Sequence, residues 1–218
     1  MDSLVISALN AEAVVWRSQQ VSQIRLSTKG SRAMSLWLGQ CAHQLMQRGW
    51  VNEAIAGINS LTLKNEKTDK WNEIFDFIGS LPLPKEEQGR SFTLPVEYDP
   101  QWGDTKTVCE HLNLDFETLV SLHSNCEYYI ACIGFLPGFV YLSGGNEKIR
   151  IPRKATPDNR VNAGSVAIAD HFTGIYPCPS PGGWHIIGKT PVESGNGNIF
   201  LQTPWKVGDR VILKAVIR

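Results

Sequence analysis

The sequence has few charged residues and no excess of either sign. Of its 218 residues 19% are charged, with 21 basic and 21 acidic side chains, whereas an average soluble domain has about 25% charged residues. A chain without net charge has no long-range field that would gather phosphates or an anionic lipid surface. The balance therefore disfavours general nucleic-acid binding and electrostatic attachment to a membrane.

Long hydrophobic runs and paired cysteine motifs are also missing. The longest uncharged segments, 128–146 and 171–188, are each broken by proline and several glycines, so neither resembles a membrane-spanning helix. The first nine residues contain Asp2 and no basic region, unlike a secretory signal. The five cysteines include no CxxC pair, which excludes a zinc ribbon and thioredoxin-type chemistry. These features predict a cytoplasmic protein with reduced thiols.

Several common catalytic patterns do not occur. No Lys-Ser or Lys-Thr follows the glycine-rich segments 134–138 and 181–183, so neither is a P-loop. There is no GxGxxG between a strand and a helix, no GxSxG elbow and no HExxH. His123 shares a predicted helical face with Phe116 and Leu119 and is interpreted as a packing residue. No metal site and no catalytic residue are predicted.

The first part of the chain is predicted to contain alternating strands and helices. β-branched and aromatic residues favour strands in 13–25, and 51–63 predicts one or two more. Ser31 is placed to cap a helix over 32–48. Apolar residues at helical spacing predict a second, amphipathic helix over 69–78. This order of elements predicts a ferredoxin-like sandwich.

The rest of the chain has a different character. Two short helices, 104–112 and 115–123, each begin with an Asp that is predicted to cap them. Segment 128–189 then holds 9 of the 19 glycines and 6 of the 12 prolines, which disfavours helices. Short strands with frequent turns predict a closed barrel or a sandwich. The predicted strands are 92–96, 128–133, 161–169, 185–188, 199–202 and 210–217. The predicted organisation is α+β, with an N-terminal domain at 1–80, a linker at 81–91 and a β-barrel domain at 92–218.

Candidate functional residues gather in the glycine- and proline-rich segment. Arg153, Lys154, Arg160 and Lys189 are cations in a charge-poor neighbourhood. Arginine forms paired, charge-assisted hydrogen bonds with carboxylates, and aromatic side chains can wall a pocket around such an anion. The structural alternative is surface ion pairing for the arginines and barrel packing for the aromatics. No base is visible beside the candidate hydroxyl groups, so no nucleophile is assigned. The candidates for substrate or partner binding are Arg153, Arg160, Ser165, Phe139, Tyr141, Thr173, Tyr176, Trp184 and Lys189.

Three ordered motifs in this segment resemble one bacterial protein family. They are GFLPGFVYL (134–142), PRKATPDNRVNAGSVAIA (152–169) and TGIYPCPSPGGWHIIGKTP (173–191). In order and spacing they are similar to the family of 5-oxoprolinase B subunits (PxpB), also called KipI-like or allophanate hydrolase subunit 1. The likeness covers residues 92–191 and is only organisational over the first 80.

The resemblance implies a ferredoxin-like N-terminal domain, a cyclophilin-like β-barrel and protein partners. Members of the family pair with a C subunit and work with an A subunit in an ATP-dependent enzyme that opens 5-oxo-L-proline to L-glutamate. The chain would then be inactive alone, and ATP would serve the complex without being assigned to one of its chains. Two alternatives stay open: a KipI-type inhibitor that binds a sensor histidine kinase, and half of a biotin-dependent carboxyltransferase or allophanate-type enzyme.

The sequence departs from the family pattern at two places beside the predicted pocket. Asp158 and Asn162 stand where the family commonly has arginine and proline, and Asp170 and Phe172 where it has glycine and glutamine. These changes concern the identity of the substrate. Asp170 either forms a polar pair with His171 or belongs with it to a solvated turn.

Overall fold

The chain folds into two compact units. The computed structural model describes residues 2–6, 11–17, 21–26, 30–65, 70–84, 90–194 and 197–217. The first unit contains residues 1–89 and a returning segment, 206–208, and the second contains 90–205 and 209–218. Each unit has a hydrophobic core of its own.

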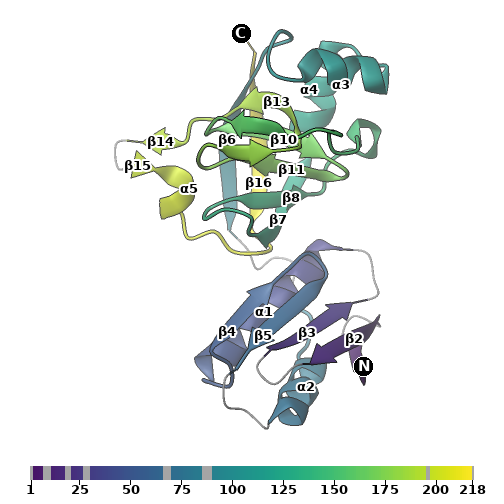
Figure 1. The fold of residues 1–218 in the computed structure, drawn as a ribbon, viewed down its shortest axis with the longest axis vertical. Coiled ribbons are helices and arrows are strands. Elements are labelled where there is room, and N and C mark those ends of the chain that lie inside the picture. The colour runs from purple at the N-terminus through teal and green to yellow at the C-terminus, as the bar shows by residue number, and fades with distance from the viewer. Residues whose placement is uncertain are drawn as a thin grey trace. The chain divides into compact units, whose positions relative to one another are not determined.

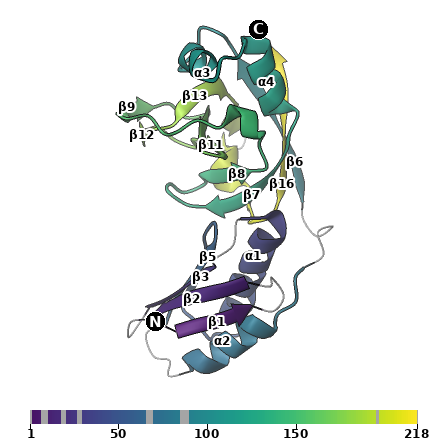
Figure 2. The same cartoon turned by 90° about the vertical axis from the view of Figure 1, so that its right-hand side faces the viewer.

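The first unit is a five-stranded sheet with two helices (Figure 1). Its elements are β1 (Asp2–Ile6), β2 (Ala11–Arg17), β3 (Val21–Leu26), α1 (Arg32–Gln47), β4 (Glu53–Ala56), β5 (Ser60–Lys64) and α2 (Trp71–Ser80). The strands lie in the order β1-β2-β3-β5-β4, and all neighbours are antiparallel. Figure 2 shows both helices on one face of this sheet. Their buried side chains form one core with those of the strands.

Helix α1 begins and ends where its sequence predicts. The Ser31 hydroxyl accepts a hydrogen bond from the Met34 N–H at 3.1 Å and so satisfies a free amide of the first turn. Gly49 follows the helix with a φ of 65°, a conformation that glycine adopts without steric penalty. The helix predicted over 69–78 is α2, although Asp69 itself lies outside the described residues.

The first unit has more strands than its sequence predicts. Segment 13–25 belongs to two strands, β2 and β3, 51–63 forms β4 and β5, and β1 was not anticipated. A ferredoxin-like fold runs β-α-β-β-α-β and needs a strand after its second helix. The strand that follows α2 is instead β6 (Ser91–Tyr98), which belongs to the barrel. The ferredoxin-like topology is therefore not confirmed.

The second unit is built around a closed barrel of seven strands. These are β6, β7 (Glu127–Ile133), β8 (Val140–Ser143), β10 (Ser165–Ala169), β11 (Phe172–Ile175), β13 (His185–Lys189) and β16 (Arg210–Ile217). Around the barrel they follow the order β10-β11-β8-β7-β16-β6-β13, and β13 pairs with β10 to close the ring. Strands β6 and β16 pair in parallel along their whole length. The closed barrel predicted from the sequence is confirmed.

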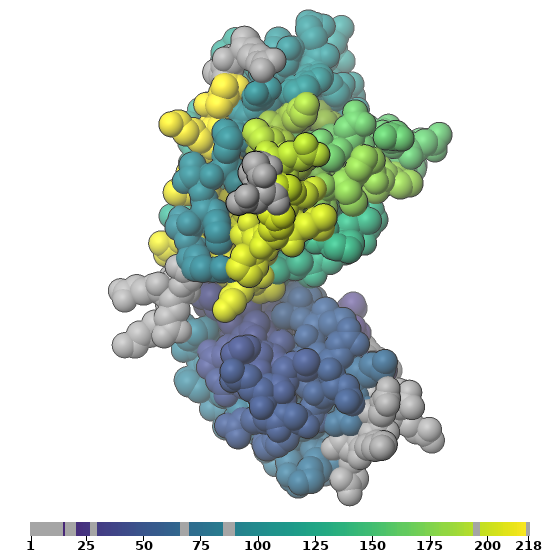
Figure 3. Space-filling view, turned by 90° about the vertical axis from the view of Figure 1, so that its left-hand side faces the viewer, coloured from purple at the N-terminus to yellow at the C-terminus, as the bar shows by residue number. Residues whose placement is uncertain are grey.

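Shorter elements surround the barrel. They are α3 (Thr105–Leu112), α4 (Phe116–Ser124), the 3₁₀ turn η2 (Glu147–Ile149), β9 (Asp158–Val161), β12 (Ser180–Gly182), β14 (Glu193–Ser194), β15 (Gly197–Asn198) and α5 (Ile199–Gln202). Strands β9 and β12 pair with each other, and Figures 2 and 3 show this ribbon projecting from the barrel. Among the described residues, no helix has both the length and the apolar character needed to cross a membrane.

Two predicted strands differ from the structure for local reasons. Residues 199–202 form α5 because the Asn198 side chain caps them, accepting from the N–H groups of Phe200 and Leu201 at 3.0 and 3.3 Å. The strand predicted over 161–169 is interrupted before β10, where Gly164 turns the chain with a φ of 82°.

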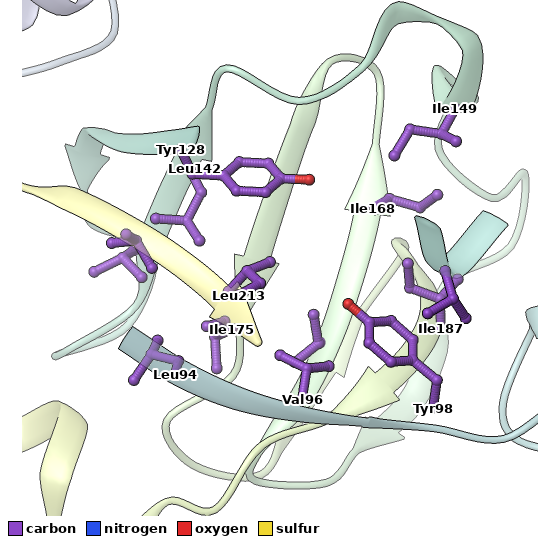
Figure 4. Close-up of a cluster of buried hydrophobic side chains, with 14 of the residues drawn as sticks. Leu94, Val96, Tyr98, Tyr128, Leu142, Ile149, Ile168, Ile175, Ile187 and Leu213 are labelled. Carbon is purple, nitrogen blue, oxygen red and sulfur yellow. The ribbon is translucent and has the colours of Figure 1, made fainter. Parts of the chain in front are cut away.

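A chain of hydrogen bonds crosses the interior of the barrel. Figure 4 shows the rings of Tyr98 and Tyr128 pointing into that interior among aliphatic side chains. His123 of α4 is fully buried; its Nδ1 lies 2.6 Å from the Tyr98 hydroxyl and its Nε2 lies 3.0 Å from Thr173 Oγ1. The Tyr128 hydroxyl donates to the His123 carbonyl at 2.8 Å. Both ring nitrogens are thus satisfied, and His123 is the packing residue that its helical position indicates.

The buried His123 should make stability depend on pH. Burial lowers the pKa of His123 in the folded protein to about 3. In the unfolded chain the histidine has its usual pKa of about 6.5. The unfolded state therefore binds more protons in the window between these values, and acid favours it. We expect the contribution of the neutral His123 to the unfolding free energy to be fully present above about pH 6.5. Below that pH the unfolding free energy should fall by up to about 1.4 kcal/mol per pH unit.

Urea unfolding of the wild type and of His123→Gln between about pH 7 and pH 4 measures this contribution. The variant should lose less stability than the wild type over that interval, whatever its stability at neutral pH. Parallel pH profiles for the two proteins would contradict the expectation.

Candidate functional site

Two cavities of the barrel unit border the β9–β12 ribbon and share the side chain of Lys154. The aromatic pocket, of about 300 Å³, is lined by Phe135, Phe139, Tyr141, Tyr176 and Trp184 together with Arg153. The cationic pocket, of about 450 Å³, is lined by Trp102, Asp158, Arg160, Asn162, Ser165 and Lys189. Both volumes fall within the range of about 300–1,000 Å³ that is typical of small-molecule sites.

Edge-to-face contacts between rings hold the aromatic pocket together. Phe139 lies centrally, with its ring centroid 4.9 Å from that of Tyr141, 5.2 Å from Tyr176 and 5.9 Å from Trp184. This geometry suits the charge distribution of aromatic rings. Phe139, Tyr176 and Trp184 are buried and Tyr141 is half-buried. Four of the predicted candidates therefore come together in one cluster.

Two glycines leave the space that these rings occupy. A Cβ atom on Gly174 of β11 would lie 2.6 Å from the Phe139 ring and 2.8 Å from the Trp184 ring. A Cβ atom on Gly182 of β12 would lie 2.9 Å from Cζ of Tyr176. Carbon atoms do not approach so closely without repulsion. Both glycines are therefore required by the packing of the pocket.

Phe135 is an exposed wall of the aromatic pocket that the predicted set does not include. Its ring is 60% exposed and meets Phe139 and Tyr176 edge to face, with centroids 5.4 and 6.4 Å apart. Its backbone has a φ of 74°, which bulky residues rarely adopt. An aromatic residue between Gly134 and Leu136, inside a glycine- and proline-rich turn, was the available signal.

Arg153 brings a positive charge to the aromatic pocket. Its guanidinium carbon lies 5.8 Å from the Trp184 ring centroid, within cation–π range. Its Nε lies 3.9 Å from a carboxylate oxygen of Asp170, but the two side chains are 61% and 50% exposed, so this ion pair is weak. Asp170 and His171 are both exposed residues of a turn. The solvated turn is therefore the correct alternative for that pair.

Two phenol groups of the aromatic pocket are available as hydrogen-bond donors. Burial raises the pKa of Tyr141. Burial, with the nearby Tyr141 and Asp158, raises the pKa of Tyr176 to about 12. Within the part of the chain that the structure describes, neither hydroxyl has a hydrogen-bond partner. Both remain protonated at neutral pH and can donate to an oxygen atom of a ligand.

Lys154 is held between two carboxylates, an arrangement we name the Lys154 clamp. Its Nζ lies 2.7 Å from Asp104 Oδ2 and 2.6 Å from Asp158 Oδ2, and its side chain is 14% exposed. Burial alone would lower the pKa of Lys154, but the hydrogen bonds and charges of the two carboxylates raise it. Asp104 Oδ2 also accepts the Ile186 N–H at 2.8 Å. Asp104 therefore does not cap α3 with its side chain, contrary to prediction, whereas Asp115 caps α4.

The remaining predicted candidates lie elsewhere. Arg160, Ser165 and Lys189 line the cationic pocket, where Lys189 Nζ lies 5.7 Å from the Trp102 ring centroid. Thr173 was predicted as a substrate-binding residue, but it is 2% exposed and its hydroxyl bonds to His123 inside the barrel. The nine candidates are thus divided between two pockets and the barrel interior.

Comparison with known proteins places this geometry in a family. Residues 13–198 match the family model described as carboxyltransferase domain, subdomain C and D. The B subunit of 5-oxoprolinase from Escherichia coli O157:H7 is 37% identical over 164 residues, which cover 70% of this chain and 72% of that protein. The B subunit of 5-oxoprolinase from Haemophilus influenzae is 34% identical over 174 residues, 78% of this chain and 82% of that protein. The chain therefore belongs to the carboxyltransferase-domain family of subdomains C and D and, within it, to the group of 5-oxoprolinase B subunits.

Solved structures show the same fold. TTHA0988 has a TM-score of 0.73 and 28% identity, with 93% of this chain covered. This chain spans 40% of the length of TTHA0988. PH0987 from Pyrococcus horikoshii has a TM-score of 0.52 and 26% identity, with 94% of this chain and 98% of that chain covered. The K. lactis urea amidolyase has a TM-score of 0.76 over 100% of this chain and 16% of that chain, but at 12% identity it shows likeness of fold alone.

Substitution of Gly174 should disturb the aromatic pocket. In Gly174→Ala the new methyl group meets two buried rings, and overpacking of this kind lowers the unfolding free energy by about 1–3 kcal/mol. Gly134→Ala is the matched control, because a Cβ there has no atom within 4 Å; we expect a change below about 0.5 kcal/mol. Urea unfolding measures both, and similar losses in the two variants would contradict this account.

Removal of the Lys154 ammonium should leave two carboxylates without their shared partner. We expect Lys154→Met to lower the unfolding free energy by about 1–3 kcal/mol at neutral pH. The pKa of Lys154 is raised in the folded protein. The stability that its ammonium group contributes is therefore fully present below about pH 10.4 and is lost as the pH rises through the pKa of the folded state. Urea unfolding at neutral and strongly alkaline pH tests this, with the exposed Lys148→Met as control. An equal penalty at both pH values would count against the clamp.

Proposed function

We propose that this chain is the B subunit of an ATP-dependent 5-oxoprolinase, a complex that converts 5-oxo-L-proline to L-glutamate. The observation that carries the proposal is the alignment of 70–78% of the chain with 5-oxoprolinase B subunits of two bacteria. The name of these relatives implies other subunits, and we propose the A and C subunits as the partners. The chain is then inactive by itself, and ATP is a requirement of the complex.

The aromatic pocket suits a small ring that carries a carboxylate and a carbonyl, as 5-oxoproline does. The exposed ring of Phe135, supported by its edge-to-face contact with the buried Phe139, offers apolar surface to the methylene groups of the lactam. Arg153 can pair with its carboxylate. The free hydroxyls of Tyr141 and Tyr176 can donate to the lactam oxygen. The pocket thus offers recognition for the methylene groups, the carboxylate and the lactam oxygen of this substrate.

Among the described residues, the same pocket contains no unprotonated group that could act as a base or a nucleophile at neutral pH, because the pKa values of its Lys154, Tyr141 and Tyr176 are all raised. None of the described residues that line it is a histidine, a cysteine, an aspartate or a glutamate. A lactam is a poor electrophile, and phosphorylation of its amide oxygen creates a group that water can displace. We therefore assign binding and orientation of 5-oxoproline to this chain, and the groups that move protons to its partners.

The alternatives receive less support. The curated relatives above are 5-oxoprolinase B subunits, not kinase inhibitors, and the urea amidolyase shares the fold alone. Two further points belong to the proposal. The barrel is taken to be cyclophilin-like, and the compartment to be the cytoplasm, since all five cysteines are free.

Reconstitution tests the function. The purified chain mixed with the A and C subunits of the same organism should hydrolyse ATP only when 5-oxoproline is present, and omission of this chain should abolish the activity. Product formation is followed as ADP and glutamate. A complete mixture that shows no 5-oxoproline-dependent hydrolysis would overturn the proposal.

Within an active complex, Arg153→Ala tests the assignment of the aromatic pocket. Loss of a charge-assisted pair with the substrate carboxylate should raise KM for 5-oxoproline about tenfold or more, with little change in unfolding free energy because Arg153 is exposed. Arg150→Ala, which removes an exposed arginine paired with Glu147, is the control and should leave KM unchanged. An unchanged KM in Arg153→Ala would remove 5-oxoproline from this pocket.

A further inference from the structure

We propose that the cationic pocket is a second ligand site, separate from the aromatic pocket, and that it binds a compact oxyanion. The proposal goes beyond the function proposed above, which places 5-oxoproline in the aromatic pocket. A carboxylate of a small acid and an inorganic phosphate share the chemistry that this site recognises.

The fixed charges around the cationic pocket leave a positive charge without a partner. The Lys154 clamp places one ammonium between two carboxylates, so it has one net negative charge and its members satisfy one another at 2.7 and 2.6 Å. Arg160 and Lys189 add two positive charges, and within the described residues neither has a carboxylate within ion-pair distance. The side chains that line the pocket therefore sum to one positive charge, which a monoanion would neutralise; Glu97, opposite Lys189 in the pairing of β13 with β6, is not part of the lining.

A hydroxyl that lines this pocket also lacks a partner among the described residues. Ser165 is 8% exposed, and its side chain makes no hydrogen bond to the part of the chain that the structure describes. Its backbone is fixed on both sides, because its N–H donates to the Asn162 carbonyl at 3.3 Å and its own carbonyl accepts from the Tyr176 N–H at 3.0 Å. The hydroxyl is not sealed off from solvent, because Ser165 lines the cationic pocket. An unpaired hydroxyl on a rigid strand at a cavity is available to donate to a ligand.

The strand register brings the donors of this site together. Ser165 and Lys189 are directly opposite each other in the pairing of β10 with β13. Opposite residues of an antiparallel pair have side chains on the same face, with Cβ atoms about 4.5–5.5 Å apart. Gly164 allows this approach, since a Cβ there would lie 2.4 Å from the Thr190 carbonyl. A hydroxyl and an ammonium group thus form one wall of the pocket.

Arg160 reaches the pocket from a different element. It belongs to β9 of the projecting ribbon, it is exposed, and no carboxylate of the described residues lies within ion-pair distance of its guanidinium, although Asp158 on the same strand lines the same pocket. A guanidinium presents two parallel N–H groups that match the oxygens of a carboxylate or phosphate. With Ser165 and Lys189 it gives three donor groups from separate strands. This donor set lacks a negatively charged acceptor, and an oxyanion supplies one.

Direct titration of the full chain tests the proposal. Isothermal titration calorimetry is carried out separately with inorganic phosphate, 5-oxo-L-proline and L-glutamate. We expect saturable binding of at least one of them. Both Arg160→Ala and Ser165→Ala should weaken that binding about tenfold or more, because each removes a hydrogen bond to a charged group. Arg150→Ala is the matched control and should bind as the wild type does.

The three titrants separate the possible sources of the oxyanion. Binding of phosphate alone identifies a phosphate site, and binding of an acid that Arg160→Ala weakens identifies a carboxylate site. Absence of binding by all three, or equal affinity of the wild type, Arg160→Ala and Ser165→Ala, would overturn the proposal. A third result would also overturn it: no binding of phosphate, together with binding of an acid that is weakened by Arg153→Ala but not by Arg160→Ala. Since the titration needs no other chain, a failed reconstitution with a successful titration would remove the proposed function and leave this site.

Discussion

The bonds of one lysine fix the region in which both pockets lie. Lys154 joins Asp104, at the start of α3, to Asp158 in β9 through its ammonium group. Its backbone N–H donates to the carbonyl of Gly183, next to β12, at 2.8 Å. Asp104 in turn holds the backbone of β13 at Ile186. Charge-assisted hydrogen bonds with little exposure are short and directional, so three segments distant in sequence, at residues 104, 154–158 and 183–186, share one rigid junction.

Packing of rings against glycine shapes the aromatic pocket in a complementary way. The bonds of Lys154 position backbone segments. Gly174 and Gly182 have no side chain and so leave the space that the rings of Phe139, Trp184 and Tyr176 occupy. A dense aromatic cluster of this kind tolerates little change of volume. The pocket is therefore largely formed before any ligand arrives, which reduces the conformational entropy lost on binding.

Sequence reasoning succeeded where the cause of a structure is local. The Ser31 cap, the stop at Gly49 and the Asp115 cap each depend on residues within one helical turn. The barrel followed from the density of glycine and proline. Prediction from the sequence failed where a residue distant in the sequence determines the contact. The carboxylate of Asp104 bonds to Lys154 and Ile186, which lie 50 and 82 residues away. Residue type alone also favoured a strand over 199–202, where the Asn198 cap produces a helical turn.

The candidate site shows the same limit. The motifs contain the aromatic residues that the structure brings into contact in one pocket. They could not show that Arg153 and Arg160 line different cavities. The motifs also gave no sign that the hydroxyl of Thr173 bonds to His123, which lies 50 residues earlier, inside the barrel. Phe135 was missed because its left-handed backbone is not encoded by residue type.

The backbone conformation of Phe135 lowers the stability of the fold but places a ring where a ligand can contact it. A bulky residue with positive φ destabilises the fold by on the order of 1–3 kcal/mol, and a ring that is 60% exposed regains little of this through burial. Glycine at this position would relieve the strain and would also remove the outer wall of the cavity. Laboratory evolution for a higher melting temperature would thus be drawn to residue 135, at the expense of recognition, which is the usual conflict between stability and activity.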